Sequence, residues 1–142
     1  MFKVITPRGK IEIEEYYKLR WALLRRPLGG KRGSEIDELE SSSFHRAIVK
    51  DNKIIGVGRI HFTKNSAQIR YMAVKNSFSR RGIGSRIVSE LEKIAKDNNI
   101  KEIFLNARIN AVKFYENNNY SKIKEVEPSF GSIVHYRMEK VL

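Results

Sequence analysis

The amino-acid sequence predicts an α+β fold, in which a mixed, mostly antiparallel sheet of about six to seven strands carries helices on both faces. Segments with a strand period of two and segments with a helical period of about 3.6 alternate in the order β-α-(α)-β-β-β-α-β-α-β-β. The 142 residues, 41% hydrophobic and 31% charged, suit one globular core. We therefore expect residues 1–142 to form a single domain.

The first part of the chain predicts a strand, a helix and an irregular stretch. Residues 2–6 alternate as a strand does, and Pro7-Arg8-Gly9 ends them. A helical spacing then extends from Glu12 to Arg26 on the residues Ile13, Tyr16, Leu19 and Leu23. Residues 31–43 are polar, with a short helix expected over residues 34–39.

The middle of the chain predicts three consecutive antiparallel strands. Residues 45–50, the turn Asp51-Asn52 and residues 54–62 have the pattern of a β-hairpin. A second turn over residues 64–66 leads into a third strand over residues 67–74. This part of the chain is therefore expected to form a meander.

A long amphipathic helix follows the meander. Its apolar residues form one stripe, made of Ile83, Ile87, Val88, Leu91, Ile94 and Ala95. Asp97-Asn98-Asn99 ends this helix. The rest of the chain predicts a short strand over residues 102–105, a short helix over residues 110–116 and two strands over residues 120–126 and 132–139.

The composition restricts the class of partner. The 28 Lys and Arg residues exceed the 16 Asp and Glu residues, giving a formal net charge of +12. This charge indicates a nucleic acid, a membrane surface, an acidic protein or a phosphate-rich cofactor, or else a solvated basic surface. Cysteine is absent, which excludes disulfides, thiolate zinc sites and cysteine nucleophiles. We find no signal peptide or membrane-length apolar stretch, so we expect a cytoplasmic protein with no membrane partner and no metal.

A glycine-rich turn, Arg80-Arg81-Gly82-Ile83-Gly84-Ser85, joins the third meander strand to the long helix. The glycines let a ligand approach the backbone, and the first N–H groups of the helix are unpaired donors that attract phosphate. Arg80 and Arg81 add positive charge suited to a diphosphate. The Walker pattern fails because no Gly-Lys-Ser/Thr follows, and the dinucleotide fingerprint fails because Ile87 replaces its third glycine.

Residues 79–84 resemble the cofactor motif Arg/Gln-x-x-Gly-x-Gly/Ala of the GNAT superfamily of N-acetyltransferases, with Ser79 at the first position. A second segment, in the expected order, is similar to the family pattern A-x-x-F-Y-E-x-x-x-Y/F and consists of Ala111, Phe114, Tyr115, Glu116 and Tyr120. Residues 105–108 (Leu-Asn-Ala-Arg) and Gly131-x-x-x-His135-x-x-Met138 look like the small ElaA-like branch of this family.

The resemblance implies a single N-acetyltransferase domain whose sheet is splayed between the fourth and fifth strands. Acetyl-CoA would be the co-substrate, and an amine on a second substrate would attack its thioester directly in a ternary complex. Tyr115 would act as the general acid that protonates the departing CoA thiolate. Because adjacent helix positions point about 100° apart, we expect Phe114 inside the core and Tyr115 in the cleft. The residues implied for cofactor binding are Met72, Ala73, Val74, Ser79, Arg80, Arg81, Gly82, Ile83, Gly84, Ser85, Asn106, Ala111 and Phe114.

The general base and the acceptor stay open at this point. Candidate bases are His45, His61, His135, Glu35, Glu38, Glu40 or a water molecule, whereas Gln68 is no useful proton acceptor. The resemblance places the acceptor against residues 33–43, where Glu35 and Glu38 would attract a cation. It also makes a homodimer a reasonable expectation.

Two alternative functions remain. A nucleic-acid-binding module would account for the basic residues Lys18, Arg20, Arg25, Arg26, Lys31 and Arg32. No helix-turn-helix, zinc or RNP-type pattern accompanies them, so nucleic acid is not the partner we expect. The other alternative is a protein of the same fold that binds CoA without turnover.

Overall fold

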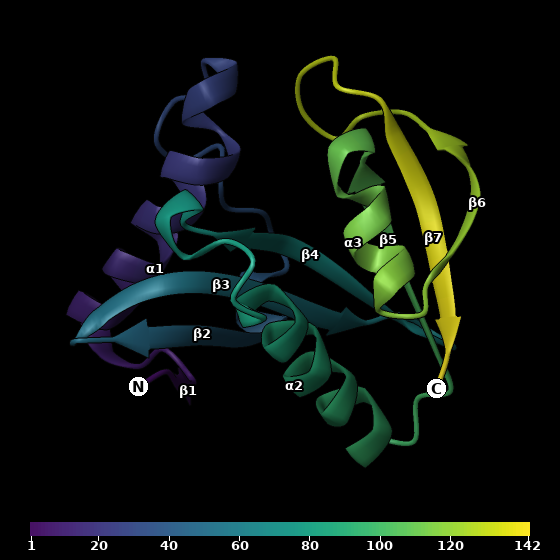
Figure 1. Cartoon of the computed structure of the whole chain (residues 1–142), viewed down its shortest axis with the longest axis horizontal. Helices are drawn as coiled ribbons and strands as arrows, with labels where there is room; N and C mark the ends of the chain where they lie inside the picture. Colours follow the sequence, from purple (N-terminus) through teal and green to yellow (C-terminus); the bar gives the residue numbers. More distant parts are fainter.

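The computed structural model describes residues 1–142, which form one seven-stranded sheet in the order β1-β2-β3-β4-β5-β7-β6 (Figure 1). The strands are β1 (Lys3–Ile5), β2 (Phe44–Lys50), β3 (Lys53–Phe62), β4 (Ala67–Val74), β5 (Glu102–Arg108), β6 (Ser121–Val126) and β7 (His135–Val141). The α-helices are α1 (Gly9–Leu24), α2 (Ile83–Asp97) and α3 (Val112–Asn117). Four 3-10 turns are η1 (Arg26–Leu28), η2 (Glu40–Ser42), η3 (Asn76–Phe78) and η4 (Ile109–Ala111). The α+β class and the order of the main elements are confirmed.

The sheet opens between β4 and β5. These two strands are parallel and pair only from Ala67 to Ile69, against Ile103 to Leu105, whereas every other neighbouring pair is antiparallel. A parallel pair needs a crossover, which α2 provides. Figure 1 shows β1 to β4 diverging from the group formed by β5, β7, β6 and α3. The expected splay is therefore present, and it leaves the β5-facing edge of β4 unpaired beyond Ile69.

Helices α1 and α2 cover opposite faces of the sheet. Successive strand residues point to opposite faces, so each helix packs on a different set of strand side chains. The α2 stripe packs in the larger core cluster with Ile48 and Ile55, whereas Tyr16 and Leu19 of α1 pack with Ala47 and other residues of the smaller one. Burying each such aliphatic side chain stabilises the fold by about 1.5–3 kcal/mol. None of the helices combines the length and apolar character needed to cross a membrane.

The expected helix over residues 34–39 is wrong: this stretch forms turns, and a 3-10 helix begins only at Glu40. The acidic side chains bind nearby backbone N–H groups instead of leaving them to a helix. Glu35 Oε1 accepts from Gly33 N–H at 2.7 Å, and Asp37 Oδ1 accepts from Leu39 N–H at 2.9 Å. Such local side-chain bonds compete with helical hydrogen bonds, so the segment stays irregular.

Candidate active site

A β-bulge in β4 lies at the point where the sheet opens. Val57 pairs with Ala73 and Arg59 with Arg70, so Tyr71 and Met72 both face Gly58. Tyr71 has a φ of 57°, which is rare for a bulky side chain and costs roughly 1–3 kcal/mol. Bulges bend a strand and redirect its side chains, and they are common next to active sites. The local geometry thus marks the splay as a functional region.

Two cavities meet in the splay. The first, of about 240 Å³, lies between β4 and β5, and the second, of about 770 Å³, lies between the end of β4, the start of α2 and α3. Met72, Ala111 and Tyr115 line both cavities. The two cavities are therefore adjacent at these residues.

The second cavity contains most of the residues predicted to bind the cofactor. Residues 72–74, 79, 80, 82–85, 111 and 114 all line it. Arg81 does not line it, and its guanidinium lies over the Phe78 ring at 5.4 Å. Asn106 lines the first cavity instead. Sequence reasoning missed four residues in the wall of the second cavity, which are Phe78, Asn110, Lys113 and Asn117.

The glycine-rich turn presents free backbone donors to this second cavity. Arg80 and Gly82 have left-handed φ values of 62° and 77°, and Gly82 caps α2 without any side-chain hydrogen bond. In α2, the first backbone N–H group that donates to an acceptor within the protein belongs to Arg86, and its acceptor is Gly82 O at 3.0 Å. The preceding N–H groups at residues 83–85 are the donors that bind an anion at a helix start.

Gly84 is required by packing as well as by ligand approach. A Cβ atom at this position would lie 2.9 Å from Phe114 Cζ, closer than real Cβ contacts. Phe114 therefore rests directly over the helix start. Any side chain at residue 84 would displace the Phe114 ring from the wall of the second cavity.

Tyr115 lies at the junction of the two cavities and belongs to the main core, with 7% of its surface exposed. Its ring stands 4.9 Å from that of Phe114 and 5.8 Å from that of Tyr120, both edge-on. Burial raises the pKa of the Tyr115 phenol, and neither a hydrogen bond nor a charge contributes. The phenol is therefore a protonated donor without a partner in the chain. The expectation that Phe114 lies inside the core is wrong, because Phe114 is only partly buried.

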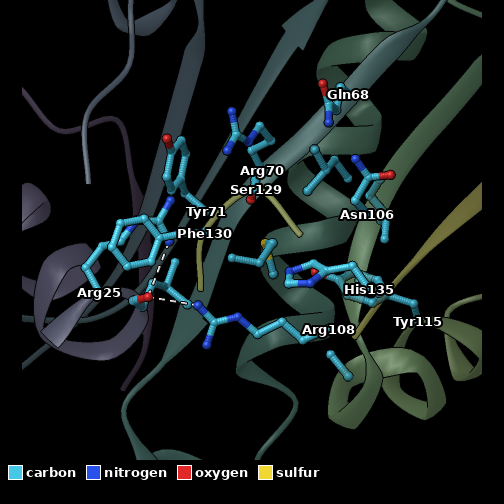
Figure 2. Close-up of a pocket in the computed structure, with 16 residues that line it drawn as sticks. Arg25, Gln68, Arg70, Tyr71, Asn106, Arg108, Tyr115, Ser129, Phe130 and His135 are labelled. Carbon is cyan, nitrogen blue, oxygen red and sulfur yellow. Dashed lines mark hydrogen bonds between the residues drawn. The ribbon is translucent and has the colours of Figure 1, made fainter. Parts of the chain in front are cut away.

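Among the histidines, only His135 lines the first cavity (Figure 2). Its Nδ1 donates to Ile133 O at 2.7 Å, so in the neutral ring Nε2 keeps a free lone pair. His45 uses both nitrogens: Nε2 donates to Glu40 O and Nδ1 lies 2.8 Å from the Tyr16 hydroxyl. Burial, followed by the charge of Arg59, lowers the pKa of His61, which lines neither cavity.

The carboxylates of residues 33–43 line neither cavity. Asp37 binds Arg59 at 2.6 and 3.0 Å and Arg70 at 3.1 Å, while Glu40 binds Arg20 at 2.8 Å. Burial alone would raise the pKa of Asp37, but these hydrogen bonds and charges lower it to about 2. Asp37 and Glu40 of the acidic segment therefore pair with arginines and form no part of either cavity wall.

Other elements complete the wall of the first cavity. Arg25, just after α1, and Phe130, in the loop before β7, lie beside Tyr71 on one side of the first cavity (Figure 2). His135 and Asn106 lie on the other side. Sequence reasoning missed this wall, because the loop carries no motif.

The basic cluster of α1 is not a continuous surface stripe. Arg20 is fully buried and Arg25 is 5% exposed, so both turn inward. Four guanidinium groups surround the Tyr71 ring, with Cζ atoms of Arg20, Arg25, Arg59 and Arg70 at 4.1, 5.4, 4.9 and 4.7 Å from its centroid. The burial of Arg20 was readable in the sequence, since it stands four residues after Tyr16 on the apolar face of the helix.

The family model described as the acetyltransferase (GNAT) domain matches residues 33–142. The chain belongs to the GNAT acetyltransferase family. It is accordingly an acyltransferase, and the resemblance read from residues 79–84 and 111–120 is confirmed.

Relatives match this GNAT chain over nearly its whole length. The uncharacterized N-acetyltransferase YjcF of Bacillus subtilis is 28% identical over 138 residues, which cover 97% of this chain and 99% of YjcF. The crystal structure of Escherichia coli ElaA has a TM-score of 0.78 at 15% identity, over 99% of this chain and 98% of ElaA. An aminoglycoside 6'-N-acetyltransferase solved with coenzyme A has a TM-score of 0.80 at 15% identity, over 99% and 96% of the two chains. At these identities the two structures establish the fold.

Proposed function

We propose that this protein transfers an acetyl group from acetyl-CoA to a primary amine by direct attack within a ternary complex. The observation that carries this proposal is the meeting of two cavities at Met72, Ala111 and Tyr115. One cavity is bordered by a helix start with free N–H donors, and the other is a smaller space lined by three arginines among apolar residues. Two substrates bound in this way would bring thioester and amine together without a covalent enzyme intermediate.

Acetyl-CoA would occupy the second cavity. The diphosphate would lie against residues 80–85, where free backbone N–H groups and Arg80 offer positive potential. The pantetheine arm would lie along the unpaired edge of β4, which can bind an extended ligand as an added strand. An aminoglycoside 6'-N-acetyltransferase of the same fold was solved with coenzyme A, which supports CoA as the kind of ligand bound here.

Catalysis would use His135 and Tyr115, which both line the first cavity. The amine lone pair attacks the thioester carbon, and His135 Nε2 accepts the proton that the nitrogen loses. A backbone N–H of β4 near Val74 stabilises the oxyanion. When the C–S bond breaks, the Tyr115 hydroxyl donates its proton to the departing thiolate, and solvent restores that proton.

Binding and turnover together test this function. Arg80→Asn removes a charge from the second cavity while keeping a residue that tolerates the left-handed backbone. We expect titration with acetyl-CoA to show binding that Arg80→Asn weakens about tenfold and makes less sensitive to salt. Arg86→Gln, which removes an exposed arginine of α2 outside both cavities, is the matched control.

The second measurement is CoA release with a panel of primary amines. Release that depends on enzyme and amine supports acetyl transfer. Tight acetyl-CoA binding with no release from any amine would instead indicate a CoA-binding protein without turnover. Equal affinity of the wild-type and Arg80→Asn proteins would remove the basis for placing the diphosphate at residues 80–85.

A further inference from the structure

The first cavity is positively charged. Three arginines line it, and no Asp or Glu does. These arginines are Arg25, after α1, Arg70, in β4, and Arg108, at the end of β5. The other polar side chains of the lining are uncharged or, for His135, basic; they are Gln68, Asn106, Ser129, Tyr71, Tyr115 and His135.

Arg25 and Arg108 have no carboxylate partner. Arg25 donates from Nε to Ser34 O at 3.0 Å and from Nη1 to Leu24 O at 3.3 Å. Arg108 donates from Nη2 to the same Leu24 oxygen at 2.8 Å, so two guanidinium groups converge on one carbonyl (Figure 2). Burial lowers the pKa of both side chains, and the charge of Arg25 lowers that of Arg108 further.

The nearby carboxylates cannot supply the missing negative charge. Asp37 is held by Arg59 and Arg70, and Glu40 is held by Arg20 and Arg59, at distances between 2.6 and 3.1 Å. Arg20 and Arg59 are themselves fully buried and need these partners. Arg25 and Arg108 are thus left beside the cavity without a counter-charge.

A fixed but unpaired guanidinium is a ready site for an anion. The Arg25 side chain is 5% exposed and is held between aromatic rings, with Cζ 4.7 Å from the Phe130 centroid and 5.4 Å from that of Tyr71. Uncompensated buried charge is unfavourable, and a planar guanidinium matches a carboxylate or phosphate with two parallel hydrogen bonds. Because the side chain is already ordered, binding an anion would cost little conformational entropy.

We infer that the acceptor is a small amine that also carries an acidic group, a carboxylate or a phosphate, which Arg25 and Arg108 bind in the first cavity. This inference rests on the proposed acetyl transfer. The volume of about 240 Å³ admits a small molecule. With the acidic group at the arginines, the amine of the same molecule points towards Tyr115 and Met72, where the first cavity meets the second.

Matched acceptors test the inference by turnover. The sets are α-amino acids beside their carboxamides and their decarboxylated amines, and phosphoethanolamine beside ethanolamine. We expect the preferred acidic acceptor to have a kcat/KM at least tenfold above its neutral counterparts. The amino-acid and phosphoethanolamine arms tell which acidic group is used. The inference would be overturned if neutral amines had a kcat/KM equal to or above that of every acidic acceptor. Such a result would leave the proposed acetyl transfer unaffected.

A binding measurement keeps the test independent of turnover. The protein is saturated with CoA, so the phosphates of CoA cannot account for further anion binding. It is then titrated calorimetrically with N-acetyl amino acids, N-acetyl-phosphoethanolamine and the uncharged counterparts, N-acetyl amino acid amides and N-acetylethanolamine. We expect an acidic probe to bind at least tenfold more tightly than its uncharged counterpart. Equal binding in every pair, or no binding of any acidic probe, would overturn the inference.

Variants assign the effect to the two arginines. Arg108→Gln and Arg25→Gln should each weaken the acidic probe about tenfold or more, raise KM for the acidic acceptor more than KM for neutral amines, and leave acetyl-CoA affinity unchanged. Arg26→Gln, which alters the exposed neighbour of Arg25, should change none of these. If Arg108→Gln weakened acetyl-CoA as much as the acidic probe, the charge would serve the cofactor and the inference would be wrong. Absence of acetyl-CoA binding in the wild-type protein would instead refute the proposed function.

Discussion

Tyr115→Phe separates a catalytic role for this residue from a structural one. The variant keeps the ring that packs against Phe114 and Tyr120 and removes only the hydroxyl. Because that hydroxyl makes no hydrogen bond within the chain, its loss should change the free energy of unfolding by less than about 0.5 kcal/mol. If it donates the proton to the thiolate, kcat should fall roughly ten- to a thousandfold, or about 1.4–4 kcal/mol in the barrier.

Tyr120→Phe is the matched control, because it removes the same atom from the neighbouring ring. The Tyr120 hydroxyl donates to Glu92 Oε2 at 2.8 Å and lies away from both cavities. Losing a hydrogen bond to a charged group should cost about 2 kcal/mol, which lowers Tm by roughly 5 °C in a domain of this size. Its kcat should stay near that of the wild type.

Thermal melts and steady-state kinetics, with a check that chemistry limits kcat, measure both variants. The expected pattern is opposite for the two: Tyr115→Phe is slow and stable, and Tyr120→Phe is active and less stable. The raised pKa of Tyr115 also keeps the phenol protonated, so the wild-type rate should not fall at alkaline pH through loss of this acid. A Tyr115→Phe protein with wild-type kcat would refute the assignment of the acid.

Three further predictions concern other residues. His135→Gln should lower kcat/KM for the acceptor at least tenfold and leave acetyl-CoA affinity intact; an unchanged kcat/KM would point to water or another base. Asp37→Asn should destabilise the protein by about 2 kcal/mol above pH 4, whereas Glu38→Gln, at an exposed neighbour, should have no effect in denaturation. Because the folded pKa of Asp37 lies below its ordinary value of 3.8, this difference should disappear as the pH falls towards 2, and a constant difference would contradict the ion-pair account. Gly84→Ala should weaken acetyl-CoA by displacing Phe114, and double substitution with Phe114→Leu should restore part of the affinity measured by titration.

The sequence was most informative where one local pattern decides the structure. The stripe from Ile83 to Ala95 has a helical period, and the strand over residues 67–74 is observed with those bounds. Residues 80–85 could be interpreted because residues 79–84 and 111–120 both resemble motifs of one family, in the expected order. The residues on one side of the candidate site could therefore be predicted without knowing any tertiary contact.

The rest depends on contacts between segments far apart in the chain. Asp37 meets Arg59 and Arg70 through tertiary folding, and no local pattern predicts that pairing. The left-handed Tyr71 is held by a bulge opposite Gly58, which a reading of strand period does not detect. The order of burial of Phe114 and Tyr115 was predicted wrongly because it depends on the helix rotation against β5 and β6.

Transfer of a labelled acetyl group tests the central claim most directly. The protein is incubated with acetyl-CoA labelled with ¹³C in the acetyl group and with a responsive amine, and the products are followed by NMR and mass spectrometry. The account predicts that label appears on the amine nitrogen in a 1:1 ratio with free CoA, with no labelled protein, and that Tyr115→Phe slows both products equally. Label retained in bound, unreacted acetyl-CoA, or transferred to the protein itself, would contradict it.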